Sequence, residues 1–121
     1  MPIFKRTISD ELIKATFYLS RSDKAKLKKA ISFCESAHVG QFRKTGEPYS
    51  NHPINVALIC AGWRLDVEAL VAGLLHDTVE DTATSLHIIS NLYGDKVAEL
   101  VDGLSKVDQL VYKSFEEKTA E

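Results

Sequence analysis

The sequence predicts an all-α fold. Apolar residues recur at intervals of three and four along most of the chain, which is the spacing of one face of a helix. No run of alternating apolar and polar residues predicts a strand, and no internal repeat is present. The 121 residues, 45% hydrophobic and 26% charged, fit one globular domain with a single modest core.

Two amphipathic helices are predicted in the first third of the chain. The first covers roughly residues 9–20, where Ser9 and Asp10 offer N-cap chemistry and apolar residues follow at helical spacing. The second opens at Ser22 and ends at Gly40, a residue type that commonly stops helices. Lysines cluster on this helix, mainly off its apolar stripe, and predict a solvent-exposed face.

A polar loop and a third helix follow. Residues 41–51 are polar and contain a glycine and a proline, which exclude regular secondary structure. A helix then runs from His52 and Pro53 to about Gly62, because proline is favoured in the first turn of a helix. His52 is therefore placed at a helix N-terminus.

Three more helices are predicted in the second half. Asp66 can cap a fourth helix that runs from Val67 to about Thr78, and this segment is so apolar that we expect it to be the central buried element. A fifth helix starts at residues 82–84 and stops at Gly94, and a sixth covers residues 95–106.

The charge and the cysteine content indicate which partners and which cellular compartment to expect. Fifteen Lys and Arg against seventeen Asp and Glu give a formal net charge of -2, which offers no overall basic field for nucleic acid or an anionic membrane. The N-terminal residues include no apolar run of signal-peptide length, and no segment approaches the roughly 20 apolar residues that span a bilayer, so we expect neither secretion nor membrane insertion. Cys34 and Cys60 are interpreted as buried thiols in a reducing compartment. We expect a cytoplasmic protein.

Four ionisable residues gather at the end of the apolar fourth helix. His76 and Asp77 are adjacent, and Glu80 and Asp81 follow in the next turn. An imidazole with a carboxylate suits Mn, Fe or Zn, and a second carboxylate pair beside a divalent ion can orient a water and take its proton. The pattern indicates metal-assisted hydrolysis of a phosphorylated compound. The alternative is a histidine that only interacts with the helix dipole.

Two further groups precede this cluster in the chain. His52 is a candidate third ligand, with a capping or buried hydrogen-bonded histidine as the alternative. Arg43 and Lys44 offer a planar guanidinium for stacking and a point charge for phosphate oxygens, with a solvated loop pair as the alternative. We assign His38 and His87 structural or surface roles.

Taken together, three segments resemble the N-terminal hydrolase domain of the RelA/SpoT family of alarmone enzymes. They read AHVGQFRKTGEPYSNHPINVA, AGLLHDTVEDTAT and YGDKVAELVDGLSKV, and they cover residues 37–107 in the same order and spacing as in the family. The resemblance implies that residues 1–121 are the N-terminal part of an HD-type helical bundle. It also implies removal of the 3′-pyrophosphate of (p)ppGpp to give GDP or GTP and pyrophosphate, usually with Mn²⁺.

The resemblance assigns roles by motif. His52 of the NHP segment, with His76 and Asp77 of the LLHD segment, would be metal ligands. Glu80 and Asp81 of VEDT would be the catalytic acidic pair that positions and activates the water.

The FRKTGEPY segment would bind the guanine nucleotide (p)ppGpp. Arg43 would stack on guanine, Lys44 would contact the phosphates, and Thr45 would be a hydrogen-bonding neighbour. This agrees with the chemistry of the residues, because a guanidinium plane stacks on a purine and an anionic substrate needs cations beside an acidic metal site.

One part of the family pattern is not found. Enzymes of this type use a further Asp ligand on a later helix, and we expect none of the remaining aspartates to replace it. The segment 114–121 reads as the beginning of a helix, so we expect a natural sequence that continues beyond Glu121. We accordingly expect weak Mn²⁺ binding and little or no turnover from this chain, and apolar surface that favours a homo-oligomer.

Two alternatives stay open. The His and His-Asp spacing also fits an HD phosphohydrolase that acts on another nucleotide. A non-catalytic fragment that keeps a nucleotide-binding or partner-binding surface fits as well.

Overall fold

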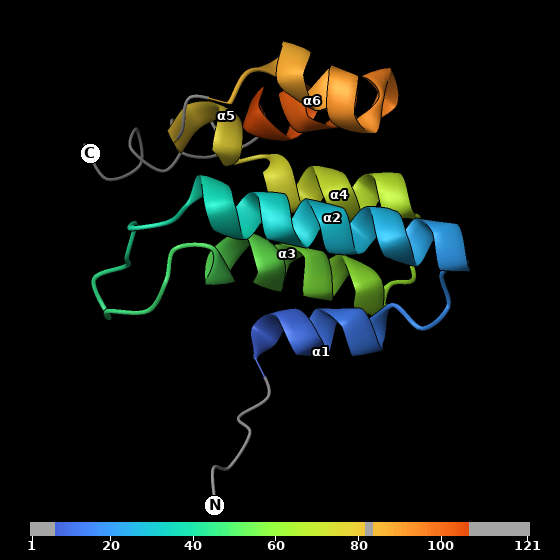
Figure 1. Cartoon of the computed structure of the whole chain (residues 1–121), viewed down its shortest axis with the longest axis horizontal. Helices are drawn as coiled ribbons and strands as arrows, with labels where there is room; N and C mark the ends of the chain where they lie inside the picture. Colours follow the sequence, from blue (N-terminus) through green and yellow to red (C-terminus); the bar gives the residue numbers. More distant parts are fainter. Residues whose placement is uncertain (1–6, 82–83, 107–121) are drawn as a thin grey trace, which may run out of the picture.

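The computed structural model of the chain describes residues 7–81 and 84–106. Its helices are α1 (Ile8–Ala15), α2 (Arg21–Ala37), α3 (Asn51–Gly62), α4 (Val67–Leu75), α5 (Thr78–Asp81) and α6 (Leu86–Tyr93), and residues 95–106 are also helical (Figure 1). The all-α prediction is confirmed: in those ranges the only β feature is one isolated bridge, between Phe42 and Pro48. None of the helices described there is long and apolar enough to cross a membrane.

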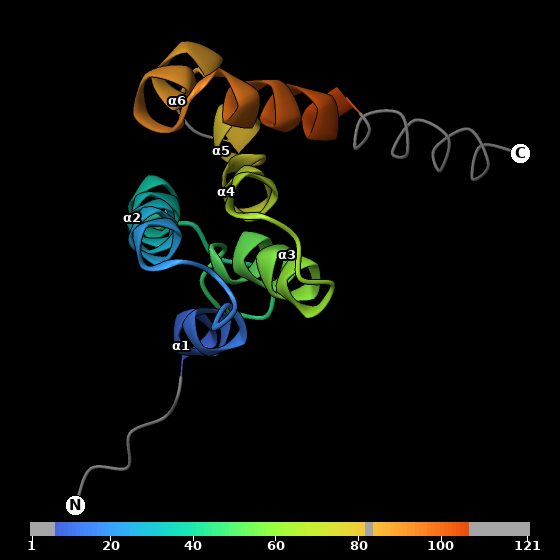
Figure 2. The same cartoon turned by 90° about the vertical axis from the view of Figure 1, so that its right-hand side faces the viewer.

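The helices pack in an order that makes α4 central. α3 packs on α4, α1 packs on α3, and α2 packs on α4. Figures 1 and 2 show α6 and the helix of residues 95–106 on the other side of α4, away from α1 and α3. α4 is thereby enclosed from several sides.

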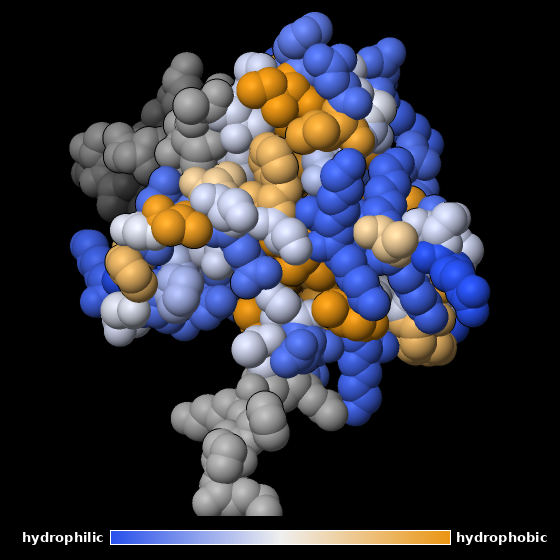
Figure 3. Space-filling view, in the orientation of Figure 1, coloured by the Kyte–Doolittle hydropathy of each residue, from blue (hydrophilic) through white to orange (hydrophobic). Residues whose placement is uncertain are grey.

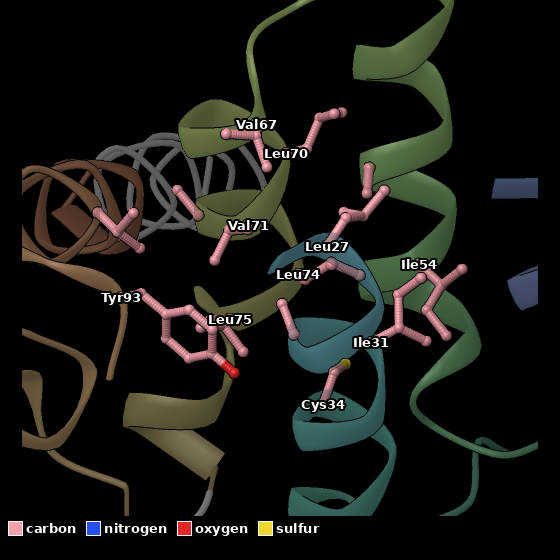
Figure 4. Packing of buried hydrophobic residues seen from close by; sticks show 14 of the residues in the cluster. Leu27, Ile31, Cys34, Ile54, Val67, Leu70, Val71, Leu74, Leu75 and Tyr93 are labelled. Atoms are coloured by element: carbon pink, nitrogen blue, oxygen red, sulfur yellow. The ribbon is translucent and has the colours of Figure 1, made fainter. Parts of the chain in front are cut away.

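Burial follows this arrangement. Seven of the nine residues of α4 are buried, which confirms the predicted central helix. Figure 4 shows Leu74 of α4 close to Leu27 and Ile31 of α2, and the ring of Tyr93 beside Leu75. Each fully buried leucine contributes on the order of 2 kcal/mol through removal of apolar surface from water.

The exposed face of α2 carries the predicted lysines. Lys28 and Lys29 are exposed, and Lys24 and Lys26 are partly so. Figure 3 shows hydrophilic side chains over much of α2, with hydrophobic ones between α2 and α1.

The start of α1 differs from the prediction. Thr7, not Ser9, is the N-cap: its hydroxyl accepts from the Asp10 backbone N–H at 3.1 Å, and the Asp10 carboxylate accepts from the Thr7 N–H at 3.1 Å. This reciprocal capping box satisfies two N–H groups and outcompetes a single cap. In the same way Ser20, not Ser22, caps α2, by accepting from the Asp23 N–H.

The end of α1 also comes earlier than predicted. The helix stops at Ala15 rather than near residue 20. Its C-cap is Thr16, whose hydroxyl lies between the carbonyl oxygens of Leu12 and Ile13, each 3.0 Å away. A threonine that bonds its own preceding turn gives the backbone an alternative to continuing the helix.

The predicted fourth helix is broken in two. α4 ends at Leu75 and α5 begins at Thr78, whose hydroxyl donates to the Leu75 carbonyl at 2.6 Å. His76 and Asp77 therefore lie in the turn between two helices instead of inside one. The predicted cap at Asp66 is confirmed, because its carboxylate accepts from the Ala69 N–H at 2.9 Å.

The later boundaries are close to the prediction. Ser85 caps α6, one residue after the predicted start at 82–84, of which residues 82 and 83 lie outside the described ranges. Gly94 ends α6 as predicted, with a φ of 100°. The helix beginning predicted over residues 114–121 also lies outside the described ranges.

Candidate metal and nucleotide site

The candidate residues meet at one end of the bundle. His52 lies in the first turn of α3, and His76 and Asp77 lie in the turn after α4. Because α3 packs on α4, these two points of the chain are brought together. Figure 1 shows the loop between α2 and α3 at the same end.

Asp77 stands between the two imidazoles. Its Oδ1 is 3.1 Å from Nε2 of His76, and its Oδ2 is 3.9 Å from Nε2 of His52. The histidine and carboxylate atoms that could bind a metal ion therefore face one another. The His76 and Asp77 side chains are 7% and 11% exposed, whereas His52 is 43% exposed, so the cluster is open to solvent on the His52 side.

A hydrogen bond to the backbone determines which ring nitrogen of His76 carries the proton. Nδ1 lies 2.7 Å from the Gly73 carbonyl oxygen, which can only accept, so Nδ1 carries a proton. In a neutral ring, Nε2 then presents a lone pair to an anionic oxygen only 3.1 Å away. A metal cation bound by both Nε2 and Oδ1 would remove that repulsion.

The donor set fits a divalent metal ion, but the ligands are not fully assembled. Two imidazole nitrogens and a carboxylate oxygen suit Mn, Fe or Zn. In the described part of the chain, no group of three or more His, Cys, Asp or Glu side chains is arranged to hold a metal ion as it stands. The His52–Asp77 separation of 3.9 Å exceeds the spacing of about 3.0–3.4 Å between adjacent ligands on bonds near 2.1 Å in octahedral or tetrahedral geometry.

A cavity of about 470 Å³ opens beside His52. It is lined by Phe42, Arg43, Lys44, Thr45, Tyr49 and His52. The three residues predicted to bind nucleotide thus share a cavity with one of the predicted metal ligands. A larger cavity of about 570 Å³, between α1, α2 and the loop, is lined by none of the predicted site residues.

Local hydrogen bonds hold the loop in shape. The Arg43 N–H donates to the Glu47 carbonyl at 2.9 Å, and the Gly46 N–H donates to the Arg43 carbonyl at 2.9 Å. Gly46 has a φ of 91°, a conformation that glycine adopts without steric cost. The segment predicted as irregular is therefore a tight, internally bonded turn.

Two predicted residues are located only by their backbone. Glu80 and Asp81 belong to α5, directly after the turn that holds His76 and Asp77, and their side chains lie outside the described part of the chain.

Sequence reasoning missed Tyr49. Its hydroxyl donates to Oδ2 of Asp77 over 3.5 Å, a long hydrogen bond, and its ring lies against His38 and His52. A polar aromatic residue three positions before His52, at the end of a cationic loop, is the signal that could have identified it. His38 is buried, as a structural residue should be, and His87 lies exposed on α6.

Comparison with known proteins decides the family. The model of the HD domain family matches residues 30–121. The chain belongs to the HD domain family. Among its relatives is the bifunctional (p)ppGpp synthase/hydrolase SpoT of Escherichia coli K12, 44% identical over 104 residues that cover 86% of this chain and 15% of SpoT.

Two further similar proteins have names that refer to the same class of enzyme. A guanosine-3′,5′-bis(diphosphate) 3′-pyrophosphohydrolase of Aquifex aeolicus is 47% identical over 88 residues, which cover 73% of this chain and 13% of that protein. The chain thus spans about 15% or less of these two relatives. A solved structure, described as a metazoan ortholog of SpoT that hydrolyses ppGpp, is 36% identical with a TM-score of 0.61, over 64% of this chain and 46% of that one. The predicted resemblance is confirmed.

Proposed function

We propose that this HD domain belongs to a metal-dependent hydrolase that removes the 3′-pyrophosphate of (p)ppGpp, giving GDP or GTP and pyrophosphate. The observation that carries the proposal is the position of His52, which faces the Asp77 carboxylate and also lines the cavity of Arg43 and Lys44. A hydrolase of a phosphorylated nucleotide needs that adjacency of metal ligands and cations. The printed names of the relatives supply the substrate class.

His52, His76 and Asp77 would hold the divalent metal ion, which we propose to be Mn²⁺. When bound, the ion would supply Lewis-acid polarisation of a phosphoryl oxygen. The Gly73 carbonyl fixes the tautomer of His76 and leaves Nε2 available as a donor. The burial of His76 and Asp77 and the exposure of His52 would leave one side of the site open to substrate.

The cavity would bind the guanine nucleotide. We propose that the Arg43 guanidinium stacks on guanine, that Lys44 contacts phosphate oxygens, and that Thr45 donates or accepts a hydrogen bond nearby. All three line the same cavity of about 470 Å³, which is large enough for part of a nucleotide.

Glu80 and Asp81 would complete the chemistry. We propose that these carboxylates orient the attacking water and accept its proton while the ribose 3′-oxygen leaves phosphorus and takes up a proton. Their place in α5, directly after the Asp77 turn, supports this role.

The cellular setting follows from the same proposal. An enzyme that degrades an alarmone acts in the stringent response, in the cytoplasm. The two free cysteines and the formal charge of -2 support a reducing compartment and no nucleic-acid or membrane partner. The exposed apolar side chains of Phe17, Ile59 and Trp63 support self-association.

The test is a panel of nucleotides offered to the chain with Mn²⁺, with products separated by ion exchange. The panel contains ppGpp, GTP, dGTP and cyclic GMP. We expect at most slow formation of GDP and pyrophosphate from ppGpp by this chain, and faster formation by a version extended through the further Asp ligand of the family. In both, the activity should be lost in Asp77→Asn and retained in His87→Ala, the matched exposed histidine. Faster conversion of a nucleotide without a 3′-pyrophosphate would favour a different HD phosphohydrolase. Conversion of none, by this chain and also by a version extended through the further Asp ligand of the family, would favour a binding module.

A further inference from the structure

Tyr49 occupies an unusual position between the nucleotide cavity and the candidate metal ligands. Its side chain lines the cavity, and its hydroxyl lies 3.5 Å from Oδ2 of Asp77. Its ring centroid is 6.3 Å from that of His52, at an edge-on angle of 63°. One side chain therefore touches the cavity and two of the three candidate ligands.

The backbone of Tyr49 is fixed on both sides. Its N–H donates to the Gln41 carbonyl at 2.9 Å, and its carbonyl accepts from the His52 N–H at 3.0 Å. Tyr49 is thus tied to the base of the loop and to the first turn of α3. These two hydrogen bonds fix the position of the Tyr49 Cα, and so limit where the hydroxyl of its side chain can lie.

His38 lies behind the Tyr49 ring, with centroids 5.0 Å apart and planes inclined by 39°. It is 2% exposed, its Nδ1 is 3.1 Å from Oε1 of Gln41, and its Nε2 is buried with no hydrogen-bond partner among the described residues. A buried polar atom without a partner costs about 1–3 kcal/mol. An apolar residue would fill the same space without that cost. Packing alone therefore does not explain why a histidine occupies position 38.

We propose that Tyr49 is a positioning residue that holds the Asp77 carboxylate in the orientation needed for metal binding, and that His38 holds the Tyr49 ring. The inference rests on the proposed metal site. A carboxylate rotates easily about its terminal bond, because that torsion has broad minima. In the structure Oδ1 lies toward His76 and Oδ2 lies toward both His52 and the Tyr49 hydroxyl, so this long hydrogen bond would limit the rotation.

The first test is Tyr49→Phe, which keeps the ring and removes only the hydroxyl. We expect the affinity for Mn²⁺, measured by calorimetry on the metal-free chain, to fall about 10-fold, as for other residues that support a metal ligand. Tyr93→Phe is the matched control, because the Tyr93 hydroxyl is buried without a partner in the described part of the chain. It should bind Mn²⁺ like the unmodified chain. Equal affinity in Tyr49→Phe would overturn the proposal.

The second test separates His38 from general destabilisation. His38→Ala should weaken Mn²⁺ binding in the unmodified chain but have little further effect in the Tyr49→Phe background, because residues that act through one contact are not additive. Additive effects would show that His38 does not act through Tyr49.

A metal-free readout distinguishes failure of this inference from failure of the proposed function. The ¹³C resonance of the Asp77 carboxyl group should shift in Tyr49→Phe and not in Tyr93→Phe. If the unmodified chain binds no Mn²⁺ but the resonance shifts, the metal site is wrong, and Tyr49 orients Asp77 for a purpose other than metal binding. If Mn²⁺ binds and neither affinity nor resonance changes in Tyr49→Phe, the positioning role is wrong and the metal site stands.

Discussion

Asp77 is the residue on which the site depends. It is the common neighbour of both imidazoles and of the Tyr49 hydroxyl, and it is largely buried. An anionic carboxylate in such a position needs a cation or donors around it, because desolvation of an isolated charge is costly. The described neighbours include one hydroxyl and two imidazoles, and the imidazoles with the carboxylate form a donor set that suits a divalent metal ion.

Cys34 lies near this cluster and gives a prediction at the residue scale. Burial, with a smaller contribution from the charges of Glu35 and Asp77, raises the pKa of the Cys34 thiol from 9.0 to about 12. The thiolate is the reactive form, so at pH 8 Cys34 should resist alkylation while the less buried Cys60 reacts first. Peptide mass spectrometry after iodoacetamide treatment would check this. Equal labelling of both cysteines in the folded chain would contradict the burial of Cys34.

The same pKa has a consequence for stability. The unfolded chain loses the Cys34 proton near pH 9, whereas the folded chain keeps it to about pH 12. The contribution to the free energy of unfolding is therefore fully present below pH 9 and is lost as the pH rises toward 12. Cys34→Ala should show a smaller alkaline loss of stability than Cys60→Ala in urea unfolding between pH 8 and 11.

At the scale of elements, the helix boundaries depend on hydrogen bonds between side chains and the nearby backbone, and only some of these can be predicted from the sequence. Asp66 was identified as a cap because a carboxylate directly before an apolar run leaves few alternatives. The break at Leu75 was missed, because Thr78 competes for a backbone carbonyl inside a run that periodicity alone reads as one helix. That break places His76 and Asp77 in a turn.

The end of α6 provides a prediction on backbone conformation. Gly94 has a φ of 100° and a ψ of 161°, a region that only glycine occupies readily, so Gly94→Ala should lower the free energy of unfolding by about 1–3 kcal/mol. Gly103 lies in a helix with open space around an added Cβ, so Gly103→Ala should raise stability by up to about 1 kcal/mol. Urea unfolding of both variants would check the pair. Destabilisation of equal size in both would contradict the assigned conformations.

At the scale of the whole molecule, one core serves both the fold and the site. α4 is enclosed by α2 and α3 on one side and by Tyr93 on the other, and its last residue leads directly into His76 (Figure 4). The motifs predicted the candidate ligands, since residue types and spacing are local. The contact of Tyr49 with Asp77 spans 28 positions and depends on how α3 packs on α4, so the sequence did not reveal it.

The enclosed α4 predicts where the stability resides. Leu74 is fully buried, so Leu74→Ala should lower the free energy of unfolding by about 2–5 kcal/mol. Leu104, on the helix of residues 95–106, is 39% exposed, so Leu104→Ala should cost less than about 1 kcal/mol. Urea denaturation would measure both. A loss at Leu104 as large as that at Leu74 would contradict the central place of α4.

The most direct measurement of the central claim is a Mn²⁺ titration followed by NMR of the histidine rings. Paramagnetic Mn²⁺ broadens the signals of the residues nearest to it. If His52, His76 and Asp77 hold one ion, the His52 and His76 signals will broaden before that of His87, and Asp77→Asn will abolish the difference. Simultaneous broadening of all three rings, or unchanged broadening in Asp77→Asn, would contradict the metal site.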